Sequence, residues 1–320
     1  MADATAVDRN ALDLFERSLR GLLTTDGVDV DAALAEVGWR DFLAADPVAA
    51  VPLLFGVQGE LLLGGTALDD VALDALDFDP SRLEIDGALV HPRRCVDAAM
   101  RHDRTLVVDG LVVGERTPAS FVVVVGSGAV IVPATALDCA VVQGIDPSLE
   151  LVRVRGTVSL ADVSMADDVD GAAVAPACRR ALAYELLGAV DAMLATATEY
   201  AQARHQFGQP IGAFQAVKHR LADVYVARQA ASAVLAESWH SEPECTTLAA
   251  KALAARAGAL AAEHCLQVLG AIGFALEHPL HRFVRRVRVL DHLYGTEAEL
   301  RTQLGRLLLA RGRVPRPGSA

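Results

Sequence analysis

The sequence predicts an α+β protein of several domains, in the chain order helices, strands, helices. Three observations support this prediction: apolar residues at helical spacing near the N-terminus, short β-branched runs in the middle, and long alanine-rich helical stretches afterwards. We expect an N-terminal helical domain over residues 1–80 and a reduced middle β-domain over 81–165. A C-terminal four-helix bundle over 166–311 and a disordered tail over 312–320 follow.

The N-terminal region has the spacing and the boundary residues of helices. In "NALDLFERSLRGLL", Leu12, Phe15, Leu19 and Leu22 share one helical face. The stretch "DVDAALAEVGWRDFLAADP" offers an aspartate as a helix N-cap. The apolar stretch "DPVAAVPLLFGVQGELLLGG" ends in two glycines, which are typical of a helix end.

The middle region changes to a strand pattern. The run "TLVVDGLVV" has two β-branched halves around Asp109-Gly110, which predicts a hairpin turn at that dipeptide. The run "SFVVVVGSGAVIVP" repeats the form, with a tight turn expected at its Gly-Ser-Gly. Several short strands within about 80 residues predict a small β-domain.

Composition excludes several classes of protein. The hydrophobic content of 52% indicates a globular chain, and the net charge of −12 argues against a nucleic-acid partner. The cysteines are scattered without a C-x-x-C pair, and the acidic start does not resemble a secretory signal. The longest apolar run is too short and too interrupted for a membrane span. We therefore expect a cytoplasmic protein with free thiols, no metal and no membrane partner.

Two segments of the C-terminal region carry chemical signals. In "EYAQARHQFGQPIGAFQAVKHRLADVY", a helix ends at a turn containing Arg204 and Phe207, where a guanidinium and free backbone N–H groups suit a phosphate. In "LQVLGAIGFALEHPLHRFVRR", Gly270 and Gly273 interrupt a helical pattern. The alternatives are a purely structural turn for the first segment and a helix C-cap for the second.

Together these segments resemble the acyl-CoA dehydrogenase family. That family has an Arg-x-Gln/Thr-Phe-Gly turn before a Phe-Gln helix, and later a Gln-Val-x-Gly-Gly-x-Gly-Tyr segment leading to Tyr-Glu-Gly-Thr. The close match covers about residues 178–306, whereas the first 170 residues resemble the family only in layout. The resemblance implies an α–β–α fold and FAD bound mainly by a neighbouring subunit. The positions that match FAD contacts are Arg204, Gln206, Phe207, Phe214, Gln267, Leu269 and Gly270.

The positions that match the family's catalytic base do not hold glutamate. The family removes a proton α to a thioester carbonyl with a carboxylate, and hydride then passes to the flavin. Here Tyr294 stands in the Tyr-Glu-Gly-Thr position, and Cys178 stands at the alternative position 26 residues before Arg204. Arg179 matches a family arginine near the substrate. Glu185 and Glu297 are the candidates for a displaced base, with salt-bridged helix residues as the alternative.

The resemblance also implies a partner. The stretch that contacts the flavin ring, Thr-Glu-Pro…Gly-Ser-Gly-Ser-Asp in the family, has no evident counterpart here. The simplest hypothesis is a short subunit paired with a longer acyl-CoA dehydrogenase subunit as αβ or α2β2, acting on a bulky, steroid-derived acyl-CoA. Two alternatives stay open: a scaffold or regulatory homologue without flavin, and a homo-oligomeric dehydrogenase with a displaced base.

Overall fold

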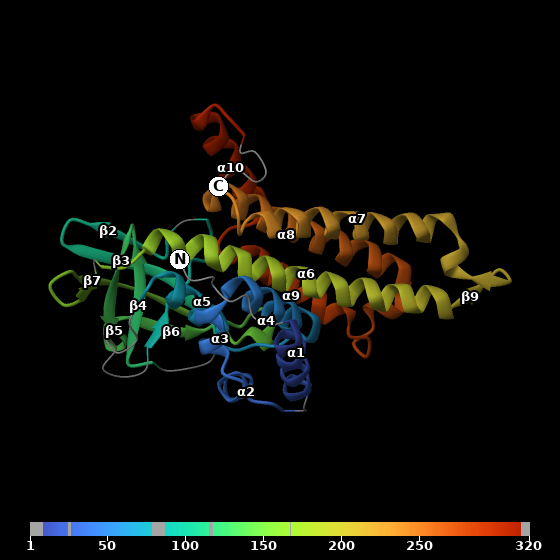
Figure 1. Cartoon of the computed structure of the whole chain (residues 1–320), viewed down its shortest axis with the longest axis horizontal. Helices are drawn as coiled ribbons and strands as arrows, with labels where there is room; N and C mark the ends of the chain where they lie inside the picture. The colour runs from blue at the N-terminus through green and yellow to red at the C-terminus, as the bar shows by residue number, and fades with distance from the viewer. Residues whose placement is uncertain are drawn as a thin grey trace.

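The computed structural model describes residues 9–24, 27–78, 87–95, 97–114, 118–166 and 168–314. Figure 1 shows the N-terminal helices and the strands gathered towards one end of an elongated helical bundle. This arrangement confirms the predicted α+β fold. Most of the predicted tail, 312–320, lies outside the described residues.

The N-terminal helices begin where the sequence supplies caps. Asp29 accepts the backbone N–H of Ala32, so the expected aspartate cap is confirmed, and Asp46 caps the later helix in the same way by accepting the N–H of Ala49. Leu19 is fully buried, as its helical spacing predicted. The helices are α1 (Arg9–Leu23), α2 (Val30–Glu36), α3 (Trp39–Ala45), α4 (Pro47–Leu61) and α5 (Ala67–Ala75).

Strands β1 to β8 form two four-stranded sheets that share a core of their own. One sheet has the order β1-β4-β5-β8 and the other β2-β3-β7-β6. Buried residues such as Phe121, Val130, Leu106 and Val154 pack between them. The strands are β1 (Gly87–Leu89), β2 (Ala99–His102), β3 (Thr105–Val112), β4 (Ser120–Val125), β5 (Gly128–Pro133), β6 (Asp138–Val141), β7 (Val152–Ser159) and β8 (Ser164–Ala166).

The hairpin predicted at Asp109-Gly110 is wrong. β3 runs straight through this dipeptide, with Asp109 paired to Arg155 and Gly110 to Val154 of β7. A side chain at Gly110 would place its Cβ 2.4 Å from Val90 Cγ1, so this glycine permits close packing rather than a turn. The other expected turn is confirmed, because β4 and β5 join tightly at Gly126.

The C-terminal region consists of long helices, and it confirms the predicted bundle. Helices α6, α7 and α8 run alternately up and down (Figure 1). The connection between α6 and α7 contains a short antiparallel hairpin of two-residue strands, β9 (His205–Gln206) and β10 (Gln209–Pro210). The helices are α6 (Gly171–Ala203), α7 (Gln215–Glu237), α8 (Pro243–Leu269), α9 (Leu280–His292) and α10 (Glu297–Arg311), with a 3-10 turn η5 (Gly270–Phe274) after α8.

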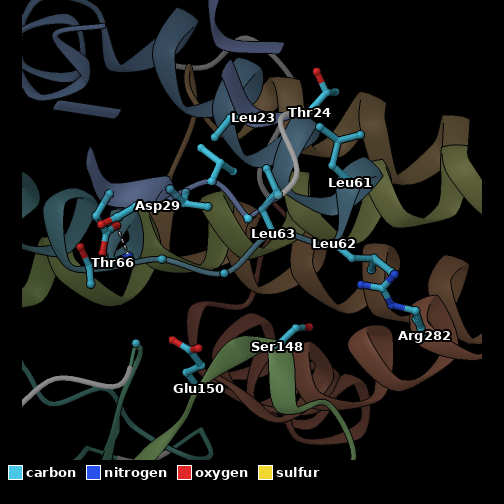
Figure 2. Close-up of a pocket in the computed structure, with 17 residues that line it drawn as sticks. Leu23, Thr24, Asp29, Leu61, Leu62, Leu63, Thr66, Ser148, Glu150 and Arg282 are labelled. Atoms are coloured by element: carbon cyan, nitrogen blue, oxygen red, sulfur yellow. Dashed lines mark hydrogen bonds between the residues drawn. The ribbon is translucent and has the colours of Figure 1, made fainter. Parts of the chain in front are cut away.

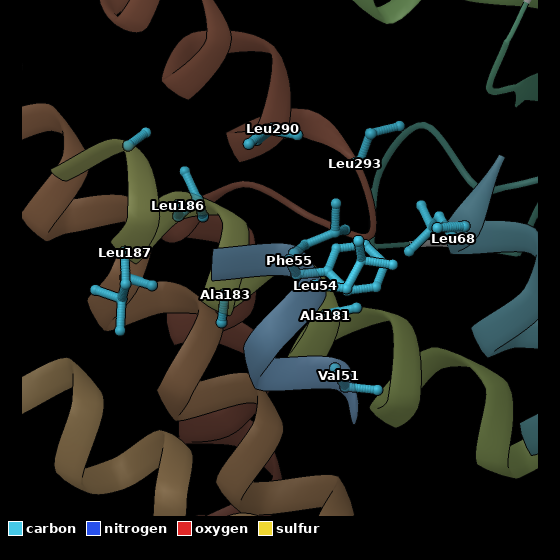
Figure 3. Close-up of a cluster of buried hydrophobic side chains, with 14 of the residues drawn as sticks. Val51, Leu54, Phe55, Leu68, Ala181, Ala183, Leu186, Leu187, Leu290 and Leu293 are labelled. Atoms are coloured by element: carbon cyan, nitrogen blue, oxygen red, sulfur yellow. The ribbon is translucent and has the colours of Figure 1, made fainter. Parts of the chain in front are cut away.

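Close contact between α4 and α6 joins the N-terminal helices to the bundle. A Cβ on Gly59 would lie 1.9 Å from the carbonyl oxygen of Glu185, and a Cβ on Gly188 would lie 2.1 Å from that of Gly56. Only glycine allows the two backbones to approach this closely. Figure 3 shows Leu54 and Phe55 of α4 in the resulting apolar core.

Helices α6 and α8 are long and apolar enough, by length and composition, to cross a membrane. Most of the apolar stretch of α6 and nearly half of that of α8 are buried inside the protein itself. A core helix of a folded domain has the same composition, so this feature is weak evidence for a membrane span.

Candidate functional site

The loop between α6 and α7 carries exposed side chains, and one of them stands on an unusual backbone conformation. Phe207 is 91% exposed and has a φ of +54°, a left-handed conformation that is unfavourable for a residue with a side chain. Its ring stands perpendicular to that of Phe214, with 6.1 Å between centroids. Arg204 and Gln206 are exposed, and within the described part of the chain the Arg204 guanidinium makes no ion pair.

The end of α8 supplies the second predicted segment. Gly270 is the C-cap of α8 with φ +62° and ψ −138°, and its N–H bonds to the carbonyl of Leu266. A Cβ at Gly270 would meet no atom within 4 Å, so the backbone conformation requires glycine here rather than close packing. The C-cap interpretation of this glycine is therefore confirmed. Gln267 is exposed, whereas the Leu269 side chain is buried.

These two segments lie at the same end of the bundle, far from the sheets (Figure 1). The α7 and α8 helices are antiparallel neighbours, and His264 near the end of α8 bonds through Nδ1 to the carbonyl of Arg220 near the start of α7, at 3.0 Å. We call residues 204–214 and 267–276 the distal end. Besides Phe207, its exposed apolar side chains are Ile272, Phe274 and Leu276.

The region around Tyr294 is different, because its polar groups are buried and bonded to one another. Tyr294 Oη lies 2.8 Å from His91 Nδ1, and His91 Nε2 lies 2.6 Å from Asp69 Oδ1. Asp69 also accepts the N–H of Leu89. With the histidine proton on Nε2, the ring donates to Asp69 and Nδ1 accepts the tyrosine hydroxyl. We call Asp69, His91, Tyr294 and Cys178 the buried relay.

Cys178 completes the buried relay, since its side chain lies close enough to that of Tyr294 for each to affect the pKa of the other. The two positions that match the family's alternative bases thus contact each other. Burial raises the pKa of the Cys178 thiol to about 12, and burial raises the pKa of Tyr294 well above its usual value. Neither group is therefore ionised at neutral pH, and neither has the properties of a general base.

The turn after Tyr294 is held by two buried cations. Lys251 Nζ donates to the carbonyls of Asp291 at 3.0 Å and Gly295 at 2.7 Å. Arg179 Nε donates to the carbonyl of Tyr294 at 3.4 Å. Burial lowers the pKa of Lys251 to about 7. These contacts stabilise positive φ angles at both Tyr294 and Gly295.

Glu185 belongs to a buried charge cluster rather than to a reactive site. Its Oε1 lies 2.7 Å from Arg286 Nη1, and Arg286 Nε lies 2.5 Å from Asp146 Oδ2. Burial raises the pKa of Glu185 against the opposing effect of Arg286. Arg286 also donates to the carbonyls of Leu62 and Leu63. We call Glu185, Arg286 and Asp146 the interdomain cluster, because it joins all three regions of the chain.

Glu297 also forms an ion pair within its own helix. It starts α10, is partly exposed, and pairs with Arg301 one turn later at 3.3 Å. The salt-bridge alternative therefore describes both glutamates, and the structure brings neither of them into the buried relay. Among the described residues, no group of three or more histidine, cysteine or acidic side chains is placed to hold a metal.

Two of the cavities lined by described residues lie away from the distal end. The larger, about 960 Å³, is an open groove between the N-terminal helices and the loop before β7, and Figure 2 shows Asp29, Glu150 and Arg282 on its walls. The smaller, about 510 Å³, lies between the start of α6, the segment after β1 and α10. Arg179, Cys95 and Tyr294 line the smaller cavity, so we call it the Arg179 cavity.

Sequence reasoning missed His91, Asp69 and Lys251. Asp69 and Tyr294 are far apart in the chain, and only folding brings both to His91. Lys251 offered one signal, since it is one of only two lysines, Lys218 and Lys251, and stands within an otherwise apolar helical stretch.

The comparisons with known proteins agree with the fold and with the helical region. Residues 176–309 match the family model described as "Acyl-CoA dehydrogenase, C-terminal domain". The acyl-CoA dehydrogenase IpdE2 of Mycobacterium tuberculosis is 38% identical over 123 residues, which are 38% of this chain and 39% of that relative. The acyl-CoA dehydrogenase FadE34 of the same organism is 34% identical over 210 residues, covering 59% of this chain and 29% of the relative.

Solved structures share the whole fold. The ChsE4-ChsE5 complex from Mycobacterium tuberculosis superposes with a TM-score of 0.70 at 18% identity, covering 98% of this chain and 100% of that one. A Tcur3481-Tcur3483 steroid ACAD variant gives a TM-score of 0.69 at 20% identity, covering 95% and 98%. The fold is similar to that of these solved structures, and residues 176–309 match the C-terminal domain of the acyl-CoA dehydrogenase family. The alignments span less than half the length of IpdE2 and FadE34 from Mycobacterium tuberculosis.

Proposed function

We propose that the chain is a subunit of an FAD-dependent acyl-CoA dehydrogenase, and that its distal end completes a flavin site formed with a longer partner subunit. The observation that carries this proposal is the exposed Arg204, which makes no ion pair with any described residue, beside the exposed Phe207 and at the same end of the bundle as Gln267 and Gly270. The distal end is thus built to contact something outside this chain.

The backbone of the distal end supports this interpretation. A non-glycine residue in the left-handed region costs about 1–2 kcal/mol, and Phe207 combines that conformation with an almost fully exposed ring. In the isolated chain neither feature is favourable. A planar ligand or a partner surface over the ring would offset both.

The residues of the distal end fit FAD. The Arg204 guanidinium offers a fork for the pyrophosphate, and the Phe207 and Phe214 rings offer apolar surface for a planar ring system. Gln267 is free to contact the ligand through its side chain, whereas Leu269 can do so only through its backbone because its side chain is buried. When bound, FAD accepts the hydride during α,β-desaturation of an acyl-CoA.

The buried relay supports the need for a partner. Burial raises the pKa of Tyr294 and of Cys178, and Glu185 is paired with Arg286, so none of them has the properties of the family's carboxylate base. The partner would supply the base. The similar fold of a ChsE4-ChsE5 complex and of a steroid ACAD favours a heteromer, with a bulky, steroid-derived acyl-CoA as substrate.

The test is to co-express this chain with a longer acyl-CoA dehydrogenase encoded beside it and to measure flavin affinity of the purified complex. We expect Arg204→Ala to weaken FAD binding at least about tenfold, because a charge-assisted bond to phosphate is lost. The matched control is Arg155→Ala, since Arg155 is an exposed arginine on β7 far from the distal end. Unchanged FAD affinity in the Arg204→Ala complex, with both chains present, would contradict the cross-subunit role.

A further inference from the structure

The open groove of about 960 Å³ combines an apolar lining with acidic side chains. It lies where α1 and α4 end and α2 begins. Its carboxylates are those of Asp29, Asp31 and Glu150, and Figure 2 shows the guanidinium of Arg282 well apart from Asp29. The apolar residues of the lining are Leu23, Val28, Val30, Leu61, Leu62 and Leu63.

The three carboxylates are exposed and have no cation to balance them. Asp29 and Asp31 accept the backbone N–H groups of Ala32 and Thr66, which leaves their negative charge in place. Among the described residues, none of the three carboxylates pairs with a basic side chain. Negative charges gathered in a concave site reinforce one another and attract cations from solution.

The negative charge of the whole chain is concentrated in the same region. Residues 1–80 contain 16 acidic and four basic residues, so they account for the entire net charge of −12. Residues 81–320 contain 25 acidic and 25 basic residues and are therefore balanced. A region of one charge sign accelerates association with a partner of the opposite sign and disfavours partners of the same sign. The molecule that suits this groove is therefore cationic.

We propose that this groove, which we call the acidic groove, is a docking site for a basic amphipathic segment of a partner protein. Lysine or arginine side chains of the segment would lie on the carboxylates, and its apolar side chains would cover the leucines and valines of the lining. A small polyamine could balance the carboxylates but would leave the apolar lining in water. This site goes beyond the flavin role of the distal end and does not depend on it.

The experiment measures fluorescence anisotropy of a labelled peptide of lysine and leucine, about 18 residues long, with the leucines on one helical face. Two companion peptides replace all leucines by alanine or all lysines by glutamate. We expect the lysine–leucine peptide to bind the full chain at least about tenfold more tightly than either companion, because only it offers both charge and apolar surface. Its affinity should fall as salt is added.

A charge variant of the chain locates the site. Asp29→Ser with Glu150→Gln removes two charges, and serine keeps the N-cap of α2. We expect binding at least about tenfold weaker. The matched control is Asp170→Ser with Asp138→Asn, which loses the same charge by the same exchange at the N-cap of α6 and at an exposed position of β6. The control should bind within about twofold of the unchanged chain.

A second variant tests the apolar lining without changing charge. Val28→Thr with Val30→Thr keeps the shape of both side chains and should weaken binding at least about threefold. Its control is Val141→Thr with Val226→Thr, at two exposed valines on β6 and α7. Three results would overturn the proposal: equal binding of the lysine–alanine peptide, equal weakening in the charge variant and its control, or unchanged binding in the folded Val28→Thr, Val30→Thr variant.

Discussion

The distal end and the buried relay differ in the solvent exposure of their functional side chains. At the distal end, Arg204 and Phe207 are exposed, and Phe207 has an unfavourable left-handed backbone conformation. In the buried relay, Tyr294 and Cys178 are inaccessible, in the positions that match the family's base. The exposed side chains are available to another molecule, whereas the buried ones are available only to their neighbours in the fold.

Among the tests of this contrast, a substitution in the interdomain cluster has the largest expected effect on stability. Arg286→Met leaves the carboxylates of Glu185 and Asp146 buried without their counter-charge, which we expect to lower the free energy of unfolding by about 3–5 kcal/mol. Urea denaturation measures the change. Arg282→Met, one turn earlier and exposed, is the control and should change stability by under about 0.5 kcal/mol. If the free energy of unfolding of Arg286→Met fell only slightly, Glu185 would not depend on Arg286 for the stability of the fold. Glu185 would then remain a candidate for the catalytic base.

The pH dependence of the free energy of unfolding tests how Lys251 stabilises the turn after Tyr294. Burial lowers its pKa to about 7 in the folded chain, against an ordinary value of 10.5. Between these pH values the unfolded chain binds more protons at this position, so the free energy of unfolding rises as the pH increases from about 7 to about 10.5.

In Lys251→Met this contribution disappears, and the carbonyls of Asp291 and Gly295 lose their donor. We expect a loss of about 1–3 kcal/mol that is larger at alkaline pH than at neutral pH. Urea denaturation at several pH values compares the two chains. Parallel stability curves for the two chains would show that Lys251 does not titrate in this window.

Tyr294→Phe separates structure from chemistry in the buried relay. Losing the hydroxyl leaves His91 Nδ1 without its donor, which we expect to cost about 1–2 kcal/mol of stability. The assembled dehydrogenase should keep its turnover within about twofold if, as we propose, the partner supplies the base. A loss of turnover of about a hundredfold with unchanged stability would instead make Tyr294 a catalytic residue.

Phe207→Gly has the smallest expected effect on the isolated chain. Glycine adopts the left-handed conformation easily, so the free chain should keep its stability or gain up to about 1 kcal/mol. The complex should nevertheless hold FAD less tightly, because the exposed ring is gone. Thermal unfolding of the chain and flavin titration of the complex measure the two effects. A destabilised free chain would show that the ring serves the fold.

Much of the fold could be predicted from the sequence because its signals are local. Helical spacing, aspartate caps and β-branched runs identified the helical and strand regions, and the Arg204 and Gln267 segments are continuous in the chain. The misplaced hairpin at Asp109-Gly110 shows the limit of this approach. A glycine required by close packing against Val90 has the same sequence appearance as one required by a turn.

The buried relay could not be predicted, for a different reason. His91 meets Asp69 and Tyr294 only after three regions of the chain fold together, and none of the three residues has a motif around it. The same holds for Glu185, whose partners Asp146 and Arg286 come from a loop of the β-domain and from α9. Contacts between distant segments decide whether a glutamate is a base or a counter-ion.

The most direct test of the central claim is the flavin content of the purified complex with a longer acyl-CoA dehydrogenase subunit. Our account predicts about one flavin for each pair of chains, lost when Arg204 of this chain is replaced by alanine and kept when Arg155 is replaced. A chain that is purified alone with bound flavin and reduces a dye with acyl-CoA would contradict it.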